Sequence, residues 1–191
     1  MPTDTSFLPL RGNYRSLIVY QKAECIYDVT FFFAHRFLEK GDRTIDQMVQ
    51  AARSGKQNIA EGSAASTTSR ETELKLINVA KASLQELLID YEDYLRVRGL
   101  VQWGPGDERY QQTRRVVAGH NDSAYYREAI QVRSDEAVAN IAITLIHQTD
   151  AMLVKLIERL KEQFVQQGGI REEMSRARLA YRNKSQNNRT Y

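Results

Sequence analysis

The sequence has few residues that break helices and almost none that could cross-link the chain. Only three of its 191 residues are proline and ten are glycine, which disfavours a fold of many short strands and favours long helices. The single cysteine, Cys25, excludes a disulfide within the chain, so we expect a reducing, cytoplasmic location. We see no segment that is long and apolar enough to cross a membrane, and no basic N-terminal stretch followed by an apolar run, so neither a membrane span nor a signal peptide is expected.

A large excess of one charge is also missing. The 27 Lys and Arg against 24 Asp and Glu leave a net charge of +3, less than is usual for a protein that binds polyanions over its whole surface. The excess lies at the C-terminal end, where residues 171–191 hold six basic and two acidic residues, a net +4 that leaves −1 for residues 1–170. Hydrophobic residues make up 42%, enough for a folded core.

Apolar spacing and capping residues predict four long helices. Capping boxes, in which a hydroxyl and an acid or amide satisfy backbone N–H groups at a helix start, are expected to begin at Thr44 and Thr68. The regular pattern breaks between residues 100 and 133, where one short helix is expected at 108–118 and a further cap at 120–123. The predicted long helices are 14–40 (ending at Gly41), 44–62, 68–99 (ending at Gly99) and the helix that Ser134 caps and Gly168 stops, and a short helix follows at 170–181.

Two of these helices have unusual faces. The first carries two apolar stripes, which implies burial on both sides, either inside the chain or against another subunit. The second has small residues at its centre, including Ala52, Ser54 and Gly55. A glycine inside a helix costs about 1 kcal/mol relative to alanine, so we expect a close approach of a neighbouring helix. We assign subunit contacts to both faces.

The segment QAARSGKQNIAEGSAASTTSRETELKLINVAKASLQELLIDYEDYL, residues 50–95, contains NIAEGS at 58–63 and ASLQEL at 82–87. It resembles the four helix bundle protein family, which includes proteins encoded by intervening sequences in 23S ribosomal RNA genes and accessory proteins of diversity-generating retroelements. The stretches LRGNYRSL, HRFLEKGDRT, NIAITLIHQT and GGIREEM are similar to the subgroup with an extra C-terminal suffix segment. The resemblance covers Leu10 to about Leu179.

The resemblance implies an all-α fold, an antiparallel up-down-up-down four-helix bundle with a C-terminal suffix segment. Its parts would be an N-terminal arm at 1–13, the bundle at 14–167 with an irregular insert at 100–133, and a basic tail at 168–191. It also implies a homo-oligomer, commonly a pentamer, without enzymatic activity or cofactor. The retroelement branch implies binding of RNA and a reverse transcriptase through a basic surface, from which the slightly acidic body of this chain departs.

Asn58, Glu61, Gly62 and Ser63 are the candidate polar residues of the shared motif. They could form a polar site, with Glu61 meeting a partner. The structural alternative is that Asn58 forms a hydrogen bond to the first helix and that Glu61 pairs with a cation. The candidates for that cation are Lys56, Arg53 and Arg36.

Sites for enzymes are not indicated. A di-metal bundle needs Glu three residues before His, but Phe32, Val117 and Thr144 precede the three histidines, so we expect no metal. His147 is expected in the core or at an interface. Cys25 has no cation nearby in the sequence to activate it, so a buried, inert thiol is expected, and no serine lies in a G-x-S-x-G context.

The basic tail is the candidate nucleic-acid contact, through Arg171, Arg176, Arg178, Arg182 and Lys184, with Tyr181 as a stacking residue. The alternatives are a solvated terminus or an arm that packs on a neighbouring subunit. Arg70, at the start of the third helix, is a weaker phosphate-binding candidate.

The sequence thus leads to one main hypothesis, a non-enzymatic oligomeric scaffold or adaptor in a complex that contains RNA or a reverse transcriptase. The alternatives are a purely protein-binding bundle and a hydrolase-type enzyme that uses Glu61. We expect no membrane partner and no small-molecule substrate.

Overall fold

The computed structural model describes residues 13–168 and 170–187, and these residues form helices and connections without a strand. The predicted all-α class is therefore confirmed. A short 3-10 helix, η1 (Tyr14–Ser16), precedes the α-helices. These are α1 (Ile18–Phe37), α2 (Thr44–Ala65), α3 (Arg70–Arg98), α4 (Glu108–Gly119), α5 (Ser123–Ala129), α6 (Asp135–Gln167) and α7 (Ile170–Asn187).

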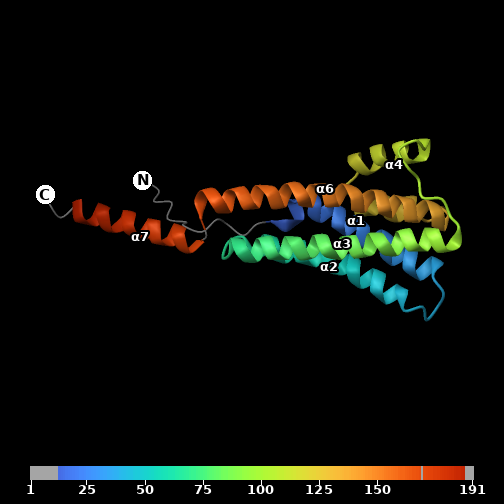
Figure 1. The fold of residues 1–191 in the computed structure, drawn as a ribbon, viewed down its shortest axis with the longest axis horizontal. Helices are drawn as coiled ribbons and strands as arrows, with labels where there is room; N and C mark the ends of the chain where they lie inside the picture. The colour runs from blue at the N-terminus through green and yellow to red at the C-terminus, as the bar shows by residue number, and fades with distance from the viewer. Residues whose placement is uncertain (1–12, 169, 188–191) are drawn as a thin grey trace.

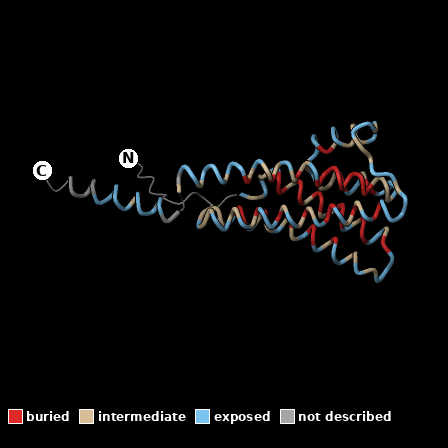
Figure 2. The backbone as a smooth tube through the Cα atoms, viewed as in Figure 1, coloured by how far each residue is buried: buried red, intermediate tan, exposed pale blue. Residues whose placement is uncertain are grey.

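The four longest helices, α1, α2, α3 and α6, lie side by side, and α7 extends away from them (Figure 1). Helix α1 contacts α2 and α6, and α3 contacts the same two helices. Figure 2 shows that buried residues gather in the half of this array where α4 lies. Fully buried side chains of these helices include Ile26, Phe33, Met48 and Leu84. The segment predicted to be irregular holds α4, which packs on α6, and α5, which packs on α1.

Several helix ends agree with the sequence. Gly99 ends α3 in a left-handed conformation, with φ of 65°, which glycine adopts without steric cost. The hydroxyl of Ser134 accepts a hydrogen bond from the Ala137 N–H at 3.3 Å and caps α6. Residues 108–119 form the expected short helix, and Asp122 caps α5.

Other predicted ends are wrong. The Thr44 N–H donates to Asp42 at 2.8 Å, so Asp42 rather than Thr44 caps α2. Ser69, one residue after Thr68, caps α3 by accepting from the Thr72 N–H at 3.2 Å. Helix α1 is shorter than predicted because Leu38 is extended. Helix α2 continues past its predicted end at residue 62 to residue 65, and α7 continues past residue 181 to residue 187.

The small face of α2 packs on α3 of the same chain. A Cβ atom added to Gly55 would lie 2.6 Å from Leu84 Cδ2, and one added to Gly62 would lie 3.1 Å from Ile77 Cδ1. Contacts that short require a neighbour to move, so both glycines permit the close approach of the two helices. The prediction of a close approach is confirmed, but the assignment of this face to subunit contacts is wrong.

One helix contradicts the expectation that no segment could span a membrane. By length and composition, Asp135–Gln166 of α6 is long and apolar enough. However, 61% of the apolar 18-residue stretch of this helix is buried inside the structure. Burial of this kind is typical of a core helix in a helical protein.

Candidate functional site

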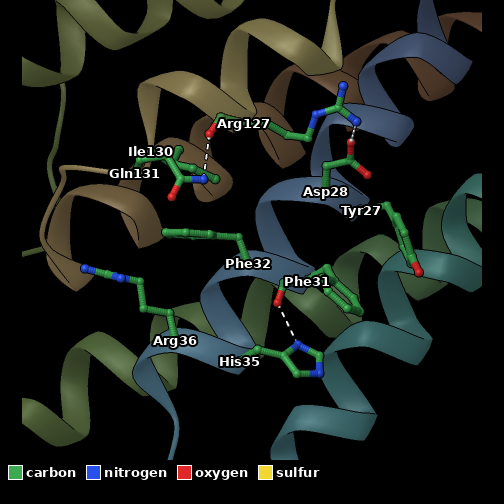
Figure 3. Close-up of a pocket in the computed structure, with 9 residues that line it drawn as sticks. All are labelled: Tyr27, Asp28, Phe31, Phe32, His35, Arg36, Arg127, Ile130 and Gln131. Carbon is green, nitrogen blue, oxygen red and sulfur yellow. Dashed lines mark hydrogen bonds and ion pairs between the residues drawn. The ribbon is translucent and has the colours of Figure 1, made fainter.

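An open groove between α1 and the α5 region is the main candidate site (Figure 3). Its volume is about 610 Å³. Helix α1 presents rings to it because Tyr27, Phe31 and His35 are spaced by one turn each, while Phe32 comes from the neighbouring face. The residues that line this α1–α5 groove are Tyr27, Asp28, Phe31, Phe32, His35, Arg36, Arg127, Ile130 and Gln131.

Aromatic surface at the groove is accessible to solvent. The Phe31 side chain is 47% exposed, although a phenyl ring is among the groups that gain most from burial. Its ring lies 4.2 Å from the His35 ring, centroid to centroid, and His35 Nδ1 is 2.8 Å from the Phe31 carbonyl. These contacts fix both rings on one exposed face of α1. An apolar surface of this kind is typical of a contact site for another macromolecule.

Polar contacts hold the opposite wall of the groove in place. The hydroxyl of Ser123 donates to the Asp28 carboxylate, and Arg127 Nη1 lies 3.3 Å from the same carboxylate. Gln131 Nε2 donates to the Arg127 carbonyl at 3.0 Å. These polar groups already have partners within the chain, so the apolar surface, rather than these polar groups, is free for recognition.

A buried lysine fixes α4 on α1, and the sequence analysis missed it. Lys22 is fully buried and donates to the carbonyls of Val117 and His120, the second at 2.7 Å. Carbonyls at the end of a helix carry a partial negative charge and lack intrahelical partners. Burial lowers the pKa of Lys22. The signal in the sequence was a lysine among the apolar residues of α1.

The motif residues Asn58 and Glu61 do not share a site. Asn58 Nδ2 donates to the Ser54 carbonyl at 2.9 Å and lies 3.1 Å from the Ser54 hydroxyl. That hydroxyl is 2.9 Å from the Ser83 hydroxyl on α3. The polar network of Asn58 therefore reaches α3, not the first helix as expected. Ser63 is buried within α2, where its carbonyl accepts from the Ser66 hydroxyl at 2.7 Å.

Glu61 is exposed and lines a second groove of about 530 Å³ between α1 and α2. Arg53 and Lys56 line the same groove. In the described part of the chain Glu61 forms no ion pair with them, and Lys56 Nζ instead lies 4.3 Å from the centroid of the Tyr27 ring. The expected pairing of Glu61 with a cation is thus not observed.

The basic tail residues lie on α7, outside both grooves. Arg176, Arg178 and Arg182 are exposed. The side chains of Arg171 and Lys184 lie outside the described residues. Arg70 Nη1 donates to the Gly168 carbonyl at 3.2 Å, which places Arg70 at the junction of α6 and α7.

The remaining candidate groups are apart from one another. Cys25 is buried, and burial raises its pKa to about 12 although Lys22, one turn away, opposes the shift. The expected buried thiol is observed, but a cation is present nearby. His147 is exposed on α6 rather than buried in the core. Residues 13–168 and 170–187 hold no cluster of three His, Cys, Asp or Glu side chains that could bind a metal.

Comparisons of the chain with protein-family models, with curated proteins and with solved structures gave no match. The resemblance to the four helix bundle protein family therefore stays a prediction.

Proposed function

We propose that the protein is a non-enzymatic scaffold that assembles with copies of itself through the α1–α5 groove. The observation that carries this proposal is the exposed aromatic surface of α1, where Phe31 and His35 are held by contacts within the chain. Burial of a phenyl side chain contributes about 2 kcal/mol, and a second copy would supply that burial. Tyr27 and Phe32 extend the same surface.

For the architecture we propose the antiparallel up-down-up-down four-helix bundle, with α1, α2, α3 and α6 as its helices and α7 as the suffix segment. The pattern of helix contacts supports this interpretation. Association as a pentamer is supported by the family resemblance alone. A cytoplasmic location is supported by the single buried cysteine.

The experiment is light scattering on the purified protein and on Phe31→Glu. A carboxylate at the centre of a buried aromatic contact is strongly unfavourable, so this variant is expected to dissociate. Val165→Glu is the matched control, because Val165 is exposed on α6 and does not line the groove. A monomeric wild-type protein, or equal masses for wild type and Phe31→Glu, would contradict the proposal.

A second candidate function is RNA contact within a nucleoprotein complex. It is favoured by exposed Arg178 and Arg182 on a helix that extends away from the body (Figure 1). When RNA is bound through phosphate contacts, the logarithm of the binding constant falls linearly with the logarithm of the salt concentration. Fluorescence anisotropy of a labelled single-stranded RNA across a salt series, with the wild type and the double variant Arg178→Ala/Arg182→Ala, tests this candidate.

Glu61 does not favour an enzymatic function. Its side chain is exposed, and the groove that it lines holds no histidine and no second carboxylate that could act with it as an acid–base pair. A hydrolase that uses Glu61 would lose its activity in Glu61→Gln, whereas the scaffold would keep its mass.

A further inference from the structure

Helix α7 has an apolar stripe that its own chain does not cover. Met174, Ala177 and Tyr181 follow the alternating three- and four-residue spacing of a coiled-coil seam. Met174 is 41% exposed and Tyr181 is 74% exposed. Arg178 and Arg182 line the same hollow of about 480 Å³. We call these five residues the α7 stripe.

Helix α3 has a face with matching properties, directed away from the core. Its residues are Val79, Ala82, Glu86, Ile89 and Asp93, again spaced by three and four. Val79 is 40% exposed and Ile89 is 57% exposed. We call these five residues the α3 outer face. A hollow of about 530 Å³ lies at its N-terminal end, beside Val79 and Ala82.

The two surfaces carry opposite charge. The α7 stripe holds two arginines and no acidic residue, whereas the α3 outer face holds Glu86 and Asp93 and no basic residue, although Arg96 on α3 pairs with Asp93 at 2.7 Å. Carboxylates crowd along α3, since burial and the neighbouring charges of Glu86 and Asp93 raise the pKa of Asp90. Arginines from another helix would relieve that repulsion.

We propose that the α7 stripe of one copy docks on the α3 outer face of a second copy. The apolar residues of each helix would pack along a common seam, and Arg178 and Arg182 would lie beside Glu86 and Asp93. This inference rests on the proposed self-assembly, but it uses surfaces separate from the α1–α5 groove.

The geometry of the junction favours a second copy over the same chain. The Gly168 carbonyl is bound by Arg70 at the N-terminal end of α3, and from there α7 extends away from the rest of α3 (Figure 1). To reach its own α3 outer face, α7 would have to point in the opposite direction along α3 (Figure 1). The α7 of another copy needs no such reversal.

The composition of the stripe favours a protein surface over RNA. Phosphate contacts would use Arg178 and Arg182 but leave Met174 and Ala177 exposed. A helix face with apolar and acidic residues would cover all five residues of the stripe.

Cysteine cross-linking tests the proposal in the full-length chain. Ala177→Cys and Ala82→Cys are prepared as separate proteins, one with a size tag, in a Cys25→Ala background, and the mixture is oxidised. The expected product is a disulfide-linked species of unequal chains. The matched control pairs Ala177→Cys with Ala151→Cys, because Ala151 is exposed on α6, and should give at least about tenfold less of that species, equivalent to about 1.4 kcal/mol.

Other products would overturn the proposal. Homodimers of Ala177→Cys alone would indicate that two α7 helices pair, and a cross-link formed only within one chain that carries both cysteines would indicate that α7 folds back. Salt-sensitive RNA binding that Arg178→Glu/Arg182→Glu abolishes, without any cross-link, would assign α7 to RNA.

Variants with reversed charges, together with Phe31→Glu, distinguish the α7 contact from assembly through the α1–α5 groove. The double variants Arg178→Glu/Arg182→Glu and Glu86→Arg/Asp93→Arg should each lose the cross-link, and mixing the two should restore it. If the cross-link survives in Phe31→Glu, the α7 contact stands without the groove. If it fails while Phe31→Glu still lowers the mass, the groove stands without the α7 contact.

Discussion

Helices α1 and α7 are both amphipathic, but α1 packs one side against the rest of the chain and exposes the face that carries Phe31. In α1 even the polar residues Lys22 and Thr30 are fully buried. Lys22 donates to two carbonyls next to the end of α4, and Thr30 accepts from the Tyr91 hydroxyl at 3.0 Å. In α7, by contrast, Met174 and Tyr181 are exposed. The difference shows that a similar amphipathic pattern can serve packing within the chain or leave a surface for a partner.

We therefore expect buried contacts to contribute to the stability of the fold, and the α7 stripe to contribute to assembly. Substitutions at the buried contacts of α1 and α2 should lower the free energy of unfolding. Substitutions in the α7 stripe should leave it unchanged and act on association instead, because exposed side chains contribute little to folding.

The largest loss in the free energy of unfolding is expected for Lys22→Met. Methionine has a similar length but no donor, so the buried Val117 carbonyl loses its partner, whereas the His120 carbonyl keeps the Tyr126 hydroxyl at 3.0 Å. Leaving a buried carbonyl unsatisfied costs about 1–3 kcal/mol, and we expect a loss of about 2 kcal/mol in urea unfolding.

The matched control for Lys22→Met is Lys155→Met, because Lys155 is exposed on α6. A change within about 0.5 kcal/mol is expected for it. Equal losses in the two variants would show that the lysine does not stabilise the contact between α1 and α4.

A smaller effect is expected for Gly55→Ala. The new Cβ would lie 2.6 Å from Leu84 Cδ2, and overpacking of this kind costs about 1–3 kcal/mol. The better helix propensity of alanine offsets about 1 kcal/mol, so a net loss of about 1 kcal/mol is expected in thermal or urea unfolding.

Gly119→Ala is the control for the glycine experiment, because nothing lies within 4 Å of its added Cβ. It should cause no loss, and a gain of at most about 1 kcal/mol. Should Gly55→Ala be as stable as Gly119→Ala, the close approach of α2 and α3 would not depend on the glycine.

The sequence predicted the helices better than their partners. Apolar spacing located the four long helices and Gly99 and Ser134 as their boundaries, because these signals are local. It placed the caps at Thr44 and Thr68 because neighbouring hydroxyl and acidic residues offer equivalent local patterns. Only the three-dimensional arrangement selects Asp42 and Ser69.

The site could be predicted only in part, since it depends on contacts between distant segments. The sequence indicated a first helix with two apolar stripes, and residues of both stripes, among them Phe31 and Phe32, line the groove. It could not indicate that residues 127–131 form the opposite wall, or that Lys22 reaches residues 117 and 120. The NIAEGS motif drew attention to Glu61, which is exposed, whereas Gly62 acts through its contact with Ile77.

The last prediction concerns how the stability of α1 depends on pH. Burial raises the pKa of Cys25 from 9.0 to about 12. The unfolded thiol therefore ionises first, so the stability from the buried neutral thiol is complete below pH 9.0 and is lost as the pH rises toward 12. The loss has a limiting slope of about 1.4 kcal/mol per pH unit.

Urea unfolding of the wild type and Cys25→Ala at about pH 8 and about pH 10 measures this loss, with all other ionising groups common to both proteins. The wild type should lose more stability than the variant between the two pH values. A chain that ends at Gly168 should behave like the wild type, because Cys25 is buried in α1 and α7 supplies none of the charges that shift its pKa. Equal pH dependence in wild type and Cys25→Ala would mean that the thiol is hydrated in the folded protein, and that α1 is less completely covered by its neighbours than its contacts indicate.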